Sequence, residues 1–557
     1  MRHTKQGDKN LFMETRLIKG GTIVDGTGRP SFKGHVLVEK DTITAVFQEN
    51  DDLPIVENET DASGCIVSPG FVDMHSHSDW LIPHSWSRNL LKHSLEQGIT
   101  TIVGGNCGFS PAPVTRESKV FLDNFLSRLL AEEPFDYQWH SMGEYLDCME
   151  KNPPALNIAE LVGHVALRYC AFGSGRTKLS SSALEKSLEM TRVSLDEGAC
   201  GLSFGLGYDP GMYCDMDELE AFCRVAASAG KPVTVHMKAL SKLSPVYPVT
   251  YMKPHNIRAI REMITIAEKT GVKLQLSHFI FVGRHSWHLA DQGLELVDRA
   301  IDDGVDVMVD AFPYTCGNTT VNVVFPYWFL DSLPDGYSSF FKVLRLKLEL
   351  EVGFRLVGFI YKDFRIMDAV TDAFRDLNGL NIVEVSKKWK TTPFKALLRL
   401  SRETNGDALM LFSAYSGDDS NQDVLEKVLS YDRCLFETDA ILRRSGYPNP
   451  ASMGTFPKIL GTYVRDKNLF SMENAIMRMT SKSAERFSIN DRGRIEPGMA
   501  ADMVVFDPGT ISDAADKDTG VPEKPAGIRY VFVNGKKMVH DGSFIDDGVS
   551  PGKILRA

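Results

Sequence analysis

Three features are missing from this 557-residue sequence, and each absence excludes a class of protein. No apolar run reaches the roughly 18 residues that a membrane-spanning helix requires, so we expect no membrane segment. Residues 1–14 are polar and lack the apolar core of a secretory signal peptide. The nine cysteines include no CxxC pair, which is typical of reduced thiols. Together these absences predict a cytoplasmic protein.

A surplus of positive charge is also absent. The 73 acidic residues outnumber the 62 lysines and arginines, giving a formal net charge of −11. This balance argues against a general nucleic-acid or anionic-membrane binder, although a local arginine can still bind a small anionic substrate. Apolar and charged contents of 43% and 24% are ordinary for a globular protein, and the length allows more than one core. We therefore expect a small-molecule enzyme, with an oligomeric state that the sequence leaves open.

Both ends of the chain are rich in short β-type runs. Residues 15–70 alternate such runs with glycine turns, and residues 501–507 and 528–535 are further β-type runs of the same kind. We predict that the segments 1–70 and 486–557 combine into one small β-sandwich.

The middle of the chain, residues 71–485, alternates short apolar strands with amphipathic helical stretches such as 183–196 and 256–270. This alternation predicts an α/β fold, a TIM-like (β/α)8 barrel, whose chemistry lies at the carboxyl ends of the strands. Residues 320–430 are too long for one connection, so we expect an insertion there that would serve as a lid. The predicted strands begin near residue 71 and continue at 98–103, 157–162, 201–203, 232–235, 273–276, 305–309 and 434–436.

Metal-binding residue types follow several of these strands. Side chains two apart on a strand share a face, so His75 and His77 leave the first strand together. A single histidine after a strand is more often structural, but six such positions in register are hard to explain by chance. Nitrogen, sulfur and carboxylate donors together suit zinc. The six predicted ligands are His75, His77, Cys107, His236, His278 and Asp439.

Several motifs carry a resemblance to the amidohydrolase superfamily and, within it, to the N-acyl-D-amino-acid deacylase (D-aminoacylase) family. The segment Asn106-Cys107-Gly108-Phe109 is the specific one, because most relatives bridge their metals with a carboxylated lysine instead. The superfamily-level signals are His75-Ser76-His77 and the tail 493–502. Further matching segments are 21–28, 69–79, 105–111, 163–168, 201–211 and 454–457.

The resemblance implies a tightly bound zinc ion on Cys107, His236 and His278, and a weaker second site on His75, His77 and Asp439. It also implies that Asp439 is the general base and then the general acid for a metal-activated water that hydrolyses a C–N amide bond.

Two further residues have two interpretations each. Tyr314 would donate to the oxyanion, or it is a packed aromatic with a satisfied hydroxyl. His164 would contact the substrate or orient a ligand.

The sequence departs from the family where the substrate carboxylate is gripped. Ala451 stands where the family has arginine, Ile280 where it has lysine, and Lys238 where it has another arginine. Alanine cannot make a bidentate ion pair with a carboxylate. We therefore predict an amide substrate that is larger, less anionic or cyclic, with replacement anchors sought among Lys238, Arg284, Arg443 and Arg444.

Two other functions remain open. A cyclic-amide hydrolase of the hydantoinase or dihydropyrimidinase kind needs a carboxylated lysine, and none stands at the end of the fourth strand, near Leu202-Ser203-Phe204. A catalytically silent relative with a binding role has no evident need for Asp439, yet the chain retains it.

Overall fold

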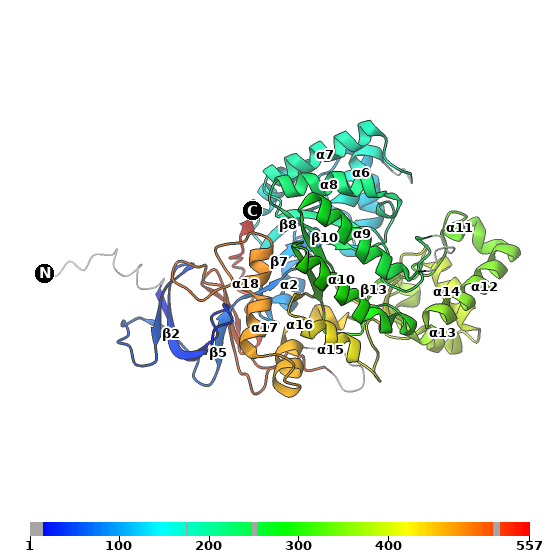
Figure 1. Cartoon of the computed structure of the whole chain (residues 1–557). Helices are drawn as coiled ribbons and strands as arrows, with labels where there is room; N and C mark the ends of the chain where they lie inside the picture. The colour runs from blue at the N-terminus through cyan, green and yellow to red at the C-terminus, as the bar shows by residue number, and fades with distance from the viewer. Residues whose placement is uncertain (1–14, 174–176, 248–252, 516–523) are drawn as a thin grey trace.

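The computed structural model describes residues 15–173, 177–247, 253–515 and 524–557, so the polar segment 1–14 lies outside it. Its centre is a parallel barrel in which the strands follow one another in chain order (Figure 1). The eight strands are β6 (Phe71–Asp73), β7 (Ile99–Gly104), β8 (Asn157–Gly163), β9 (Gly201–Gly205), β10 (Pro232–His236), β11 (Lys273–Leu276), β12 (Val307–Ala311) and β16 (Cys434–Phe436).

The barrel nearly closes between its first and last strands. The backbone N–H of Asp439 donates to the carbonyl of His75 at 2.9 Å, and that of His77 donates to the carbonyl of Ala440 at 3.0 Å. The (β/α)8 architecture expected from the sequence is thus confirmed, with all eight predicted strands present.

Two of the helices around the barrel begin at residues whose side chains cap them. The Ser180 hydroxyl accepts the N–H of Ala183 before α7 (Ser181–Asp196), and the Asp215 carboxylate accepts that of Glu218 before α8 (Met216–Ser228). Within the described residues, no helix is long and apolar enough to cross a membrane. The other barrel helices include α2 (Arg88–Leu95), α5 (Met142–Lys151), α6 (His164–Phe172), α9 (His255–Thr270), α10 (Ala290–Asp302), α15 (Asp423–Ser430), α16 (Pro450–Lys458), α17 (Met472–Met479) and α18 (Ser481–Arg486).

The two ends of the chain form a small all-β unit, as predicted. Its halves meet where β5 pairs antiparallel with β17, with Val67 opposite Val505, and a separate apolar core includes Ile18, Val36 and Phe532. The hydrogen bonding runs through one continuous sheet, in the order β20-β19-β18-β17-β5-β1-β2-β3, with β4 beside β1. These strands are β1 (Thr15–Ile23), β2 (Phe32–Glu39), β3 (Thr42–Gln48), β4 (Asn58–Asp61), β5 (Ile66–Pro69), β17 (Met503–Phe506), β18 (Ile528–Val533), β19 (Lys536–His540) and β20 (Ser543–Phe544).

The last strand of the chain does not belong to the terminal sheet. Strand β21 (Ile554–Leu555) leaves the terminal sheet and pairs in parallel with β8 of the barrel, with Ile554 opposite Ile158. The terminal segment therefore contributes to both parts of the molecule.

The segment predicted as an insertion contains its own sheet. Strands β13 (Cys316–Thr320), β14 (Phe364–Asp368) and β15 (Leu409–Ser413) pair antiparallel in the order β13-β15-β14. Four helices accompany them and bury a separate apolar cluster, and they lie on the side of the barrel away from β2 and β5 (Figure 1). They are α11 (Tyr327–Leu330), α12 (Phe340–Val357), α13 (Ile382–Lys388) and α14 (Pro393–Glu403).

Candidate metal centre

The six predicted ligands all lie at the carboxyl ends of barrel strands. His75 and His77 follow β6, and Cys107 lies in the turn after β7. His236 is the last residue of β10. His278 follows β11 and Asp439 follows β16.

Four of these side chains converge on one point. Cys107 Sγ lies 3.4 Å from His75 Nε2, 3.8 Å from His236 Nδ1 and 3.6 Å from His278 Nε2. The two nitrogens of His236 and His278 are 2.9 Å apart. Zinc bonds of about 2.3 Å to sulfur and about 2.0–2.1 Å to nitrogen imply ligand separations of roughly 3.4–3.6 Å in a tetrahedral site. The donor set suits zinc, and the separations from Cys107 lie close to this range, whereas the 2.9 Å between the two imidazole nitrogens is shorter.

A second group adjoins the first through His75. The Asp439 Oδ1 atom lies 3.6 Å from His75 Nε2 and 3.4 Å from His77 Nε2. Both histidines are buried, whereas the Asp439 side chain remains 18% exposed. The structure thus brings all six predicted residues together, with the carboxylate on the side that solvent reaches.

The backbone of three of these residues is strained. Cys107, His278 and Asp439 have φ angles of 54°, 32° and 47°, a region that residues other than glycine rarely occupy. The turn that carries Cys107 requires glycine at position 105, because a Cβ there would lie 2.1 Å from the carbonyl oxygen of Leu161. The fold therefore holds the donors in place by local backbone conformations that are costly on their own.

The electrostatics of the centre favour neutral imidazoles. Burial lowers the pKa of His75, His236 and His278, and neighbouring imidazoles lower the pKa of His75 and His236 further. Burial raises the pKa of the Cys107 thiol, and the charge of Asp439 raises it further. Neutral imidazoles offer free lone pairs, and a bound cation would reverse the penalty on the thiolate, so the centre is suited to a cation.

A layer of buried polar groups supports the ligands. Asp310 accepts the backbone N–H of His278 at 2.6 Å and the side-chain amide of Gln275 at 2.7 Å. Its Oδ1 atom and Oε2 of Glu437 each lie 3.8 Å from His75 Nδ1. Burial raises the pKa of Asp310 to about 7. Sequence analysis missed Asp310 and Glu437, although Asp310 lies near the carboxyl end of β12 and Glu437 directly follows β16.

A second carboxylate secures the closure of the barrel. Asp73 accepts the hydroxyl of Thr438 at 2.5 Å and the backbone N–H of Thr438 at 3.0 Å. Because Thr438 immediately precedes Asp439, this contact fixes the catalytic candidate relative to β6.

The Tyr314 hydroxyl is engaged away from the six ligands. It donates to Asp513 Oδ2 at 2.9 Å, and the ammonium nitrogen of Lys458 lies 3.8 Å from the ring centre. This contact corresponds to the interpretation of Tyr314 as a packed aromatic with a satisfied hydroxyl. Another tyrosine that sequence analysis did not single out, Tyr208, lies beside the centre, with its ring 4.3 Å from that of His236. The signal was present, because Tyr208 lies within the quoted motif 201–211.

His164 belongs to a separate buried cluster. Its Nε2 lies 3.0 Å from Glu218 Oε1, and Arg168 binds the same oxygen at 2.5 Å. Cys214 Sγ lies 3.3 Å from that oxygen, and Lys238 donates to the Cys214 carbonyl at 3.1 Å. The Arg168 guanidinium already supplies the positive charge there, so this cluster is an internal polar network.

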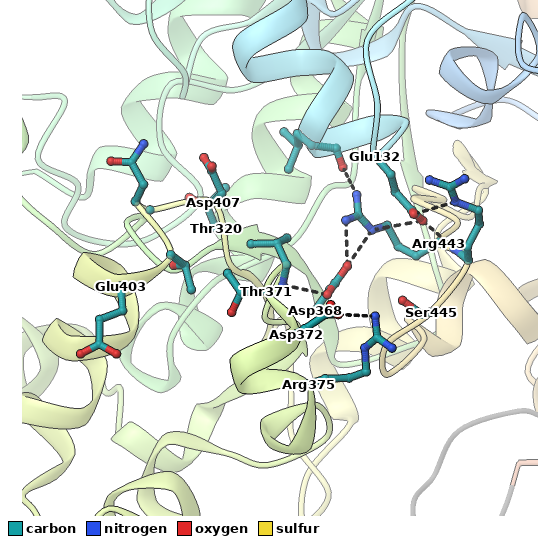
Figure 2. A pocket seen from close by; sticks show the side chains of 16 residues that line it. Glu132, Thr320, Asp368, Thr371, Asp372, Arg375, Glu403, Asp407, Arg443 and Ser445 are labelled. Carbon is teal, nitrogen blue, oxygen red and sulfur yellow. Dashed lines mark hydrogen bonds and ion pairs between the residues drawn. The ribbon is translucent and has the colours of Figure 1, made fainter.

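Arg443 is occupied by ion pairs at a neighbouring pocket (Figure 2). The pocket, of about 530 Å³, is lined by Asp368, Glu132 and Arg375 among others. Arg443 binds Asp368 at 2.8 Å and lies 3.7 Å from Glu132, with its side chain only 6% exposed. Arg444 also pairs with Glu132, at 2.9 Å. Through Asp368, Arg443 connects the barrel to the insertion.

The other proposed anchor, Arg284, is occupied in the same way, by Asp363 at 2.8 Å and Asp418 at 3.2 Å. Two of the three positions at which the resemblance implies a basic residue, Ile280 and Ala451, have apolar surroundings in the structure. Ile280 and Ala451 are buried in one cluster with Phe312.

Comparison with known proteins agrees with this geometry. A model described as "Amidohydrolase family" matches residues 416–539. The chain is 29% identical to N-acyl-D-glutamate deacylase of Alcaligenes xylosoxydans xylosoxydans, covering 97% of this chain and 96% of that protein. It is 27% identical to D-aminoacylase of the same organism, covering 97% of each. A crystal structure of N-acyl-D-glutamate deacylase from Bordetella bronchiseptica, in complex with zinc and a phosphonate inhibitor, has a TM-score of 0.77 at 28% identity, covering 97% of this chain and 99% of that one.

With its barrel, its terminal β unit and the metal-type residues at the strand ends, the chain is similar to proteins of the amidohydrolase superfamily. Within that superfamily, the chain resembles the D-aminoacylases and N-acyl-D-amino-acid deacylases along nearly its whole length, which confirms the resemblance seen in the sequence.

Proposed function

We propose that this protein is a zinc-dependent hydrolase that deacylates N-acyl-D-amino acids or a related small amide. The convergence of Cys107, His236 and His278 beside Asp439 is the observation that carries the proposal. Relatives named as deacylases of N-acyl-D-amino acids match nearly the full chain. The net charge of −11 and the absence of CxxC pairs support a small-molecule substrate and a cytoplasmic location over a nucleic-acid or membrane partner.

The cofactor assignment distinguishes two positions. Cys107, His236 and His278 would hold a tightly bound zinc ion, because all three are buried and their donor atoms converge. His75, His77 and Asp439 would hold a weaker second ion, because Asp439 is partly exposed. Zinc at such a site supplies a Lewis acid that lowers the pKa of a bound water from about 15.7 toward about 7.

Asp439 would carry out the proton transfers. Its carboxylate takes a proton from the attacking water as the C–O bond forms, and returns it to the amide nitrogen as the C–N bond breaks. The products are a carboxylic acid and an amine. His75 and His77 lie within 3.6 Å of the carboxylate and fix its position.

Substrate recognition would differ from that of a simple N-acyl-D-amino acid. Ile280 and Ala451 offer no charge, and Arg443 is held by Asp368. We propose a substrate with a larger or less anionic amine portion. Weaker candidates for contact with it are Tyr314, His164, Lys238 and Arg443, although all four make other contacts here.

The alternatives lose support from specific observations. Strand β9, which reads Gly-Leu-Ser-Phe-Gly, carries no lysine to be carboxylated, as a hydantoinase-like cyclic-amide hydrolase would require. A silent binding protein would not need the strained φ of 47° that presents Asp439 to His75 and His77.

The test is hydrolysis by the zinc-loaded protein of paired N-acyl-D- and N-acyl-L-amino acids, with acidic, apolar and amide-capped members, and of a hydantoin ring. We expect turnover of the D series, with apolar or capped members preferred over acidic ones, and strongly reduced turnover by an Asp439→Asn variant. Turnover of hydantoin alone would establish the cyclic-amide alternative, and zinc binding without turnover would establish the silent one.

A further inference from the structure

Helix α12 (Phe340–Val357) has an apolar face that nothing in the described chain covers. The helix lies at the outer edge of the insertion, far from the terminal β unit (Figure 1). Its inner face buries Leu346, Leu350, Phe354 and Val357 in the core of the insertion. The outer face repeats apolar residues at every fourth position: Phe340, Leu344, Leu348, Val352 and Leu356.

These side chains are strongly exposed. Phe340 and Phe341 are 73% and 80% exposed, and Leu348 in the middle of the helix is 56% exposed. Seven of the thirteen large apolar side chains that are exposed in the described residues lie between positions 340 and 360. Scattered apolar residues on a surface need no explanation, but a contiguous stripe of this length marks an interaction site.

Beside the middle of the stripe, the charged side chains form two ion pairs. Arg345 and Glu349 form an ion pair of 2.7 Å, and Lys347 and Glu351 form one of 3.7 Å. With 3.6 residues per turn, the first pair lies on one flank of Leu348 and the second on the opposite flank. On each flank, therefore, a cation precedes an anion by one turn.

This pattern distinguishes the two ways in which the helix could pair with a copy of itself. In an antiparallel pair related by a two-fold axis at Leu348, like flanks face each other with reversed direction. Arg345 then lies two residues, or about 3 Å along the axis, from Glu349 of the other copy. Lys347 lies at the same offset from Glu351 of the other copy.

A parallel pair reverses the outcome. Opposite flanks then face each other. Arg345 lies at the two-residue offset from Lys347 of the second copy, and Glu349 lies at the same offset from Glu351 of the second copy. Like charges at that offset repel, and in the parallel pair such contacts outnumber the one between opposite charges, Lys347 with Glu349. In the antiparallel pair Glu349 and Lys347 each also face the same residue of the other copy, but contacts between opposite charges are twice as many as those between like charges, so this arrangement is favoured.

We propose that the outer face of α12 is a self-association surface, through which two copies of this chain pair antiparallel about a two-fold axis at Leu348. The helix contains 18 residues and so offers a ridge of roughly 27 Å. With aromatic side chains each presenting on the order of 150–250 Å², the stripe supplies an area comparable to the roughly 800 Å² per partner of a specific interface.

A lipid surface is the competing occupant, and the charges disfavour it. Helices that lie on anionic membranes carry lysine and arginine along their polar flanks. Here each flank also carries an exposed glutamate, Glu349 or Glu351, close to the middle of the stripe. The pattern therefore matches a second copy of the helix better than a uniformly negative surface.

The first experiment measures the mass of the full-length, zinc-loaded protein by sedimentation velocity across a range of concentrations. We expect a dimer whose dissociation constant rises at least about 10-fold in Leu348→Glu, since the change places charge at the centre of the interface. The matched control is Ile55→Glu, because Ile55 is 95% exposed on the terminal β unit and should not alter the dimer. A wild-type protein that stays monomeric at all concentrations would overturn the proposal.

The second experiment tests the orientation. Under mild oxidation, Leu348→Cys should cross-link to itself, and a mixture of Leu344→Cys and Val352→Cys should form the mixed dimer. Self-cross-linking of Leu344→Cys and Val352→Cys, each alone, would indicate a parallel pair and contradict the proposed axis. Unmodified protein under the same oxidant shows any background from the native cysteines.

The charge pairs allow a rescue test. Arg345→Glu with Lys347→Glu should weaken the dimer, and adding Glu349→Lys with Glu351→Lys should restore it, because the swapped pattern keeps its two-fold symmetry. Thermal unfolding verifies that each variant is folded. Flotation of monomeric protein with phosphatidylcholine–phosphatidylserine vesicles, abolished by Leu348→Glu, would reject the second copy in favour of a lipid surface.

Discussion

Asp310 accepts the backbone N–H of His278 at 2.6 Å, so a buried carboxylate fixes the main chain of a metal-type residue. Its other oxygen binds Gln275. We expect Asp310→Asn to weaken zinc binding about 10–100-fold, the usual cost of losing such a supporting contact. Competition with a chromophoric chelator measures this. Asp196→Asn, at an exposed position on α7, is the control, and equal affinities for the two variants would contradict the role of Asp310.

Cys107 should determine the tight zinc site. Cys107→Ser removes the only sulfur donor near His236 and His278 among the described residues, and we expect zinc affinity to fall by more than about 100-fold, beyond the range of supporting contacts. Metal content after dialysis, measured by mass spectrometry, tests this expectation. Cys65→Ser, at a half-buried cysteine of the terminal β unit, should keep its zinc. Full zinc retention in Cys107→Ser would show that the thiol is not a ligand.

Asp439→Asn separates proton transfer from metal binding. Asparagine tolerates positive φ, so the backbone at 47° should persist while the base is lost. We expect kcat to fall about 10²–10⁴-fold, with zinc on Cys107, His236 and His278 retained. Steady-state kinetics beside metal analysis checks both expectations, and near-normal kcat would assign the base to another residue.

Arg443 should affect stability rather than substrate affinity. Arg443→Ala leaves Asp368 and Glu132 without a buried cation, and such a loss costs about 3–5 kcal/mol. The exposed Arg444, changed to alanine, should cost less than about 1 kcal/mol. Urea unfolding measures both. An increase in KM of Arg443→Ala without loss of stability would instead make Arg443 a substrate anchor.

Acid should weaken the cluster around Glu218. Burial raises the pKa of this carboxyl, but hydrogen bonds and charges of His164 and Arg168 outweigh it and lower the pKa to about 2. Because the folded pKa lies below the usual 4.5, the stabilisation is complete above about pH 4.5 and is lost as the pH falls toward 2. Unfolding free energies over that range should decline less steeply in Glu218→Gln, and parallel curves would refute the assignment.

Much of the fold follows from the sequence because the eight short strands are apolar and separated by regular helices. The metal-type residues were recognisable since each lies at the end of such a strand or within four residues of it. The same pattern did not single out Asp310 or Glu437, because a carboxylate after a strand has the same appearance whether it faces a metal or solvent. Arg443 shows the opposite limit, because its partner Glu132 lies more than 300 positions away and only the folded chain reveals the pair. Strand β21, with two residues, is too short to produce a pattern.

The left-handed conformations at Cys107, His278 and Asp439 set stability against function at these positions in protein engineering. Glycine at any of the three would relieve conformational energy, of order 1–3 kcal/mol, while it deletes a donor atom. Selection for thermal resistance alone would therefore reward variants that have lost their chemistry. A search for a more robust form of this protein must screen for turnover at every round, because at these three Cα atoms robustness and reactivity compete.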